Sequence, residues 1–73
     1  KSRTKDIVLA RQVAMYEIRR MTTLSLQEIG EAFSRDHTTV MHSIERIENM
    51  DKKSPEMAEI LKDINANINA RYE

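Results

Sequence analysis

Apolar side chains recur at intervals of three and four residues along almost the whole chain, and only short polar segments interrupt this pattern. Such spacing places apolar residues on one face of an α-helix, whereas a half-buried strand would alternate apolar and polar residues. No alternating run occurs in the 73 residues, which include one glycine and one proline. The sequence therefore predicts an all-α fold, a small helical bundle with helices at about residues 4–21, 26–33, 37–50 and 55–71.

Polar residues that can cap helices mark where these helices begin. Ser25 opens an S-x-x-E capping box, and Asp36 offers a second N-cap. Ser54 precedes Pro55, which suits the first position of a helix because its missing N–H is not needed there. Gly30 lies inside the short second helix, where it lowers helix propensity but lets a neighbouring backbone come close. These signals predict a short helix, a turn of two or three residues and a longer helix.

The size and composition of the chain exclude several classes of protein. Residues 1–73 suffice for one small domain and are too few for a two-domain enzyme. No apolar window is long enough for a membrane span, and no cysteine is present for disulfides or thiolate metal sites. His37 and His42 lie about 140° apart on a helix, which disfavours a shared metal ion. We expect a cytoplasmic domain without enzymatic activity, metal or cofactor, and, because it opens at Lys1, a fragment of a larger protein.

The formal net charge is zero, but the charges are unevenly distributed along the chain. Residues 1–20 carry six basic and two acidic groups, a net of +4, whereas residues 21–50 carry two basic and five acidic groups, a net of −3. Residues 51–73 are close to balanced, at −1. The basic first segment is typical of a surface that faces a polyanion, although a solvated helix face can have the same composition.

Residues 25–49 have the layout of a helix-turn-helix, in which the first turn of the second helix meets base edges in the major groove of DNA. That turn here begins with short polar side chains that can bond to base edges or phosphates: Asp36, His37, Thr38 and Thr39. Asp and Thr residues also cap helices that bind no DNA, so the spacing alone leaves both interpretations open.

The five methionines raise a second possibility for the surface. Met15, Met21 and Met57 fall on or beside the apolar stripes, which favours a place in the core. Exposed Met and Ile side chains would instead favour a helical protein–protein docking module without sequence-specific DNA binding. This module is the alternative to DNA binding.

Three sequence runs resemble one family. They are Ala10-Arg-Gln-Val-Ala-Met-Tyr16, Ser25-Leu-Gln-Glu-Ile-Gly30 and Arg35-Asp-His-Thr-Thr-Val40. In this order they are similar to the C-terminal DNA-binding domain of bacterial replication initiators of the DnaA family, from about Lys1 to Ile47. The resemblance implies a helix-turn-helix in a Trp-repressor-like arrangement. It also implies binding to double-stranded DNA at the DnaA boxes of a replication origin, with a nucleoid-associated location.

The resemblance implies roles for particular residues as well. In the major groove the base contacts would be Asp36, His37, Thr38 and Thr39, and Arg3 would enter the adjacent minor groove. The phosphate contacts would be Arg11, Gln12, Arg19, Leu26, Gln27 and Arg35. In this family a separate domain, absent from the 73 residues, binds ATP or ADP and assembles with other copies of the initiator.

Two positions depart from the pattern of the family. Members usually carry two residues, Gly-Gly or Gly-Asn, before the Arg-Asp-His run, whereas here Phe33 is followed by Ser34 alone. The turn is therefore one residue shorter and lacks a glycine, which we expect to rotate the reading helix slightly. Glu45 stands where members often have a basic or neutral residue, and it should weaken phosphate contacts from that part of the helix.

Overall fold

The computed structural model describes the backbone of residues 2–72 and the side chains of residues 4–70. It contains α1 (Ser2–Met21), α2 (Leu26–Phe33), α3 (His37–Lys53) and α4 (Pro55–Tyr72), with no strand among the described residues. The all-α fold predicted from the apolar spacing is thus confirmed. No helix in this part of the chain combines the length and the apolar character that crossing a membrane requires.

The third helix is longer than predicted, and the turn after it is shorter. Helix α3 runs to Lys53 rather than Met50, because Ser54 N–H still donates to the Met50 carbonyl at 2.8 Å. Pro55 then disfavours a helical conformation at the residue before it. Ser54 also accepts from Met57 N–H at 3.2 Å through its hydroxyl, so one residue ends α3 and caps α4. The turn expected over residues 51–54, between the two predicted helices, is reduced to Ser54.

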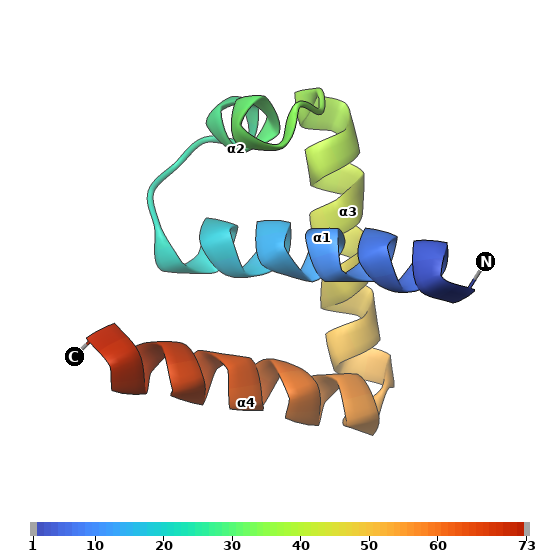
Figure 1. Cartoon of the computed structure of the whole chain (residues 1–73), viewed down its shortest axis with the longest axis vertical. Helices are drawn as coiled ribbons and strands as arrows, with labels where there is room; N and C mark the ends of the chain where they lie inside the picture. Colours follow the sequence, from blue (N-terminus) through green and yellow to red (C-terminus); the bar gives the residue numbers. More distant parts are fainter. Residues whose placement is uncertain (1, 73) are drawn as a thin grey trace.

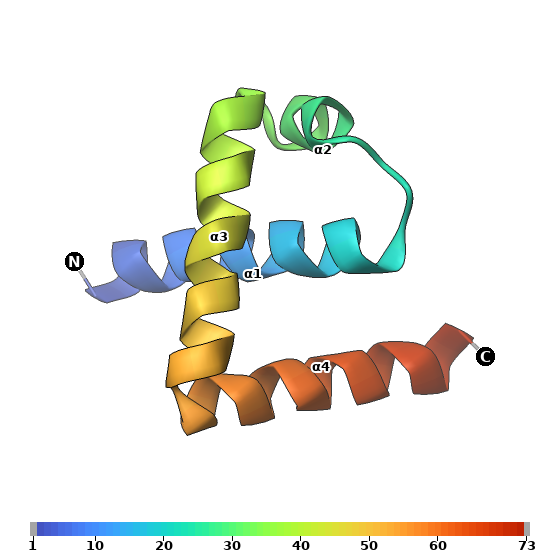
Figure 2. The same ribbon diagram turned by 180° about the vertical axis from the view of Figure 1, so that it is seen from behind.

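Helix α3 is the centre of the fold, because it packs against each of the other three helices. Helix α1 crosses it near its middle, α2 lies beside its N-terminal end, and α4 leaves from its C-terminal end (Figure 1). The reverse view shows the same arrangement, with α2 and α4 at opposite ends of α3 (Figure 2). The first turn of α3 therefore lies at the end of the molecule that is remote from α4.

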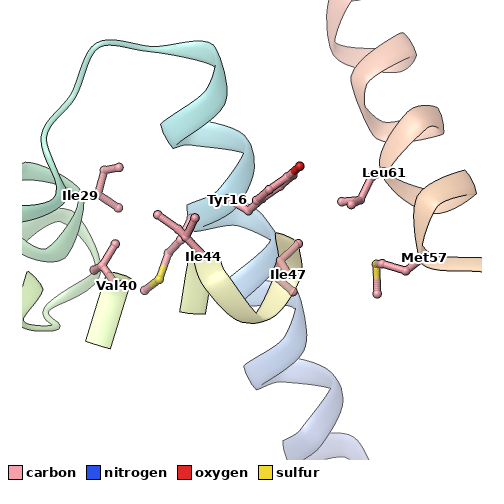
Figure 3. Close-up of a cluster of buried hydrophobic side chains, with 8 residues drawn as sticks. Tyr16, Ile29, Val40, Ile44, Ile47, Met57 and Leu61 are labelled. Carbon is pink, nitrogen blue, oxygen red and sulfur yellow. The ribbon is translucent and has the colours of Figure 1, made fainter. Parts of the chain in front are cut away.

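The core draws side chains from all four helices, and Figure 3 shows Tyr16 of α1 directed toward Leu61 of α4. Its buried members are Met15, Tyr16, Ile29, Val40, Ile44, Ile47, Met57 and Leu61. The prediction for Met21 was wrong, because this side chain is 43% exposed at the end of α1. Ile7 has the correct spacing for the core face yet is 57% exposed, because it lies toward the other end of the same helix.

Among the described residues, one carboxylate is buried at the edge of this core. Glu17 is 4% exposed, and its Oε2 atom has no hydrogen-bond partner. Its Oε1 atom lies 3.5 Å from Nη1 of Arg20, whose guanidinium stands over the Tyr16 ring at 5.7 Å. Burial raises the pKa of Glu17, the nearby charge of Asp51 raises it further, and Arg20 opposes the shift.

This environment predicts that Glu17→Gln stabilises the protein at pH 7 by about 1 kcal/mol. A raised carboxyl pKa means that the folded state holds the proton more tightly than the unfolded state. Glu17 therefore reduces stability as pH rises from its ordinary value of 4.5 through the higher folded pKa. Urea unfolding at pH 5 and pH 7 should show a flatter pH dependence for the variant. The exposed Glu59→Gln has the same charge change and should leave that dependence unaltered; equal profiles for the two variants would contradict the role of burial.

Candidate nucleic-acid interface

The first turn of α3 presents polar groups to solvent. Asp36 is the N-cap, and its Oδ1 atom accepts from Thr39 N–H at 2.8 Å. Hydrogen bonds from the backbone and side chain of Thr39 hold the pKa of Asp36 below its ordinary value. The helix-capping interpretation is thus correct for this residue, but the cap uses only one carboxylate oxygen. The fully exposed Asp36 keeps Oδ2 available for an outside donor.

His37 and Thr38 lie between these capping residues and have no hydrogen-bonding role of their own in the described structure. Both side chains are exposed. The backbone N–H groups of Thr39 and Val40 are taken by Asp36, so those of His37 and Thr38 remain directed outward. The first turn therefore offers two free amides and two unengaged polar side chains.

The start of α2 repeats this arrangement with a complete capping box. Ser25 accepts from Glu28 N–H at 3.0 Å, and the Glu28 carboxylate accepts from Ser25 N–H at 2.8 Å. Among the described residues no acceptor pairs with the N–H groups of Leu26 or Gln27. Because helix N-termini favour anions, these two amides suit a phosphate. The side chain of Leu26 packs against the core, so only its backbone is suited to that contact.

The turn between the two helices depends on one left-handed residue and one close approach. Ser34 adopts φ 57°, and its N–H donates to the Glu31 carbonyl at 3.3 Å. The Arg35 N–H donates to the Gly30 carbonyl at 2.8 Å, which completes a Schellman motif. A Cβ atom on Gly30 would collide with the Arg35 carbonyl oxygen, so the predicted reason for this glycine is confirmed.

Arg35 itself is directed back toward this turn. Its Nη1 atom donates to the carbonyls of Phe33 at 3.3 Å and Ser34 at 3.1 Å. The side chain is exposed and retains other N–H groups, but its observed position satisfies the turn. The family resemblance implies a phosphate contact for Arg35, and the structure adds this local role in the turn.

The expected phosphate-binding residues of α1 lie on one side of the helix. Arg11 and Arg19 are about 80° apart around its axis, and Arg11 is half-buried. Nη1 of Arg19 donates to the Leu24 carbonyl at 2.7 Å, which brings this guanidinium to the loop before α2. The Gln12 side chain accepts from Arg46 of α3 at 2.7 Å. The side chain of Arg3 lies outside the described residues.

Arg46 was missed by the sequence analysis, which considered only the acidic neighbour Glu45 at this point in the helix. The spacing in the sequence could have identified Arg46, because Thr38, His42 and Arg46 are four residues apart and share one face of α3. All three are exposed. This face leads from the first turn of α3 toward its crossing with α1.

Comparisons with known proteins agree with this layout. A family model described as the bacterial dnaA protein helix-turn-helix matches residues 1–47. The chromosomal replication initiator protein DnaA of Deinococcus radiodurans is 45% identical over 71 residues, which cover 97% of this chain and 15% of that protein. The protein of the same name from Caldanaerobacter subterraneus is 44% identical over 68 residues, 93% of this chain and 15% of that protein.

A third relative, the protein of this name from Oenococcus oeni, is 65% identical over 48 residues, which cover 64% of this chain and 11% of that protein. The chain thus spans about 15% of the length of the first two relatives. No solved structure matches it.

Proposed function

Because this chain belongs to the bacterial DnaA helix-turn-helix family, we propose that it binds double-stranded DNA at DnaA boxes of a replication origin. The observation that carries this proposal is the first turn of α3, where His37 and Thr38 are exposed and unengaged. Exposed polar groups at this position are what a reading helix needs in the major groove. Asp36 and Thr39 would add base contacts from the same turn.

Phosphate contacts would fix the position of this reading turn on the duplex. The free amides of Leu26 and Gln27 offer one contact at the start of α2, beside the guanidinium of Arg19. Arg11 and Gln12 offer others from α1, with Arg3 in the adjacent minor groove. Such contacts set register and supply most of the salt-dependent affinity.

In this proposal the chain is the anchoring module of an initiator that acts on chromosomal DNA in the cytoplasm. Binding of ATP or ADP and assembly with other initiator copies would belong to parts of the protein outside these residues. The role of the chain itself would be to recognise the site, without catalysis.

The alternative, a protein-docking module, is favoured by one feature, an apolar groove between α1 and α4. It is lined by Asp6, Leu9, Ala10, Val13, Met57, Ile60 and Ile64. Docking in such a groove would depend little on salt. DNA binding releases counterions, so its affinity falls steeply as salt rises.

Fluorescence anisotropy with a DnaA-box duplex and a scrambled duplex at several salt concentrations separates the two functions. If about five phosphates are neutralised, the logarithm of the association constant should fall with the logarithm of salt at a slope of roughly −4 to −5. The box duplex should also bind more tightly than the scrambled one at each salt concentration. Equal affinity for the two duplexes would contradict sequence-specific binding.

A further inference from the structure

The two flanks of the first half of α1 carry different chemistry. Thr4, Val8 and Gln12 are spaced by four residues, so they share the flank that meets α3. Asp6 and Ala10 instead line the groove toward α4. Asp6 is the only carboxylate in residues 4–16, so this part of α1 presents no acidic group on the flank toward α3.

A hollow lies on that flank, at the crossing of α1 and α3. It is lined by Thr4, Lys5 and Val8 of α1 and by Arg46 of α3. Figures 1 and 2 both show the N-terminal part of α1 extending beyond this crossing. Two cations and one hydroxyl thus converge from separate helices on a single concave site.

Gln12 forms a hydrogen bond with one of the two cations of this site, Arg46. Arg46 has only N–H donors, so the Gln12 atom that it bonds at 2.7 Å must be the amide oxygen. This bond joins α1 to α3 and holds the Arg46 guanidinium at the crossing of the two helices. Arg46 and Lys5 carry only N–H donors and two positive charges, and the Thr4 hydroxyl can donate as well, so the matching ligand is an anion that accepts, such as a DNA phosphate.

We propose that this hollow is a phosphate subsite for the DNA backbone, in which Arg46 and Lys5 contact the phosphate and Gln12 positions Arg46. The proposal rests on the proposed DNA binding and deepens it. Thr38, His42 and Arg46 lie along one face of α3, so a strand followed away from the first turn of α3 reaches this hollow. Through this subsite, α1 and α3 would both contact the same strand of the duplex.

The test is the salt dependence of binding to the box and scrambled duplexes for single and double variants. Arg46→Gln and Lys5→Gln should each weaken binding to both duplexes on the order of fivefold and reduce the steepness of the salt dependence by about one. Lys62→Gln removes the same charge from an exposed site on α4 and should change neither quantity. Thermal unfolding by circular dichroism checks that each variant keeps its fold.

Gln12→Ala tests the positioning role, since it removes no charge. It should nevertheless make the salt dependence less steep, by less than one, because Arg46 is no longer held toward the phosphate. The double variant with Arg46→Gln should lose less affinity than the product of the two single losses. Full multiplicative losses would overturn the positioning role of Gln12.

The possible failures are distinguishable. If the unaltered chain binds box and scrambled DNA equally, the proposed site recognition fails. The phosphate subsite is then still tested by the salt dependence of the Arg46→Gln and Lys5→Gln variants. If the unaltered chain prefers the box while Arg46→Gln and Lys5→Gln behave like Lys62→Gln, the subsite is wrong and the proposed function survives. Absence of any DNA binding overturns both.

Discussion

Gly30→Ala is expected to lower the free energy of unfolding by about 2 kcal/mol, although alanine is the better helix former. Helix propensity alone would favour alanine by about 1 kcal/mol. The added methyl group, however, would collide with the Arg35 carbonyl oxygen, and it would lie 3.4 Å from the Asp36 carbonyl carbon. Both are backbone atoms, so relief requires movement of the turn rather than a change of rotamer. Urea unfolding followed by circular dichroism measures the loss.

Ser34→Gly is the control in the same turn, with an expected effect of opposite sign. Ser34 adopts φ 57°, a left-handed conformation that costs a non-glycine residue about 1 kcal/mol. Glycine at this position should therefore stabilise the protein by about that amount. An unchanged or increased stability of Gly30→Ala would refute the close approach of the two backbones.

His37→Ala is expected to weaken binding to a DnaA box by about 1 to 3 kcal/mol, which corresponds to roughly tenfold to a hundredfold. The reason is that the His37 side chain is exposed in the first turn of α3 and supports no described contact within the domain. Its removal should therefore affect reading of DNA rather than folding. Binding to a scrambled duplex should change little, and the melting temperature should stay the same.

His42→Ala provides the matched control for this variant. It removes the same imidazole from an exposed position further along α3. We expect it to leave the ratio of box to scrambled affinity unchanged, whatever it does to the total affinity. If His37→Ala weakened both duplexes alike, the assignment of this side chain to base reading would be incorrect.

The starts of α2, α3 and α4 could be predicted from sequence because the chemistry that fixes them is local, whereas α1 begins at Ser2 rather than at about residue 4. Ser25, Asp36 and Ser54 each accept a hydrogen bond from the backbone N–H three residues later. Such bonds require only a short polar side chain at the correct position. The end of α3 was placed three residues early because Asp51-Lys-Lys was assigned to the turn, whereas the helix continues until Pro55 prevents it.

The limits of the core and part of the interface could not be predicted, because they depend on where helices cross. Spacing favoured a place in the core for Met21, and Ile7 has the same helical spacing, but spacing does not show where along α1 its packing partners end. The bond between Gln12 and Arg46 joins residues 34 apart in sequence. It forms only because α1 crosses α3 at that point, and no local pattern encodes the crossing.

If the domain reads DNA as proposed, the different roles of residues in the first turn of α3 limit how its preferred target sequence can change. Asp36 and Thr39 hold each other in the cap, and the Thr39 carbonyl accepts from Ser43. His37 and Thr38 have no such obligation. A library randomised at these two codons should therefore yield folded proteins with new target sites, whereas changes at the two capping positions would alter recognition and helix stability together.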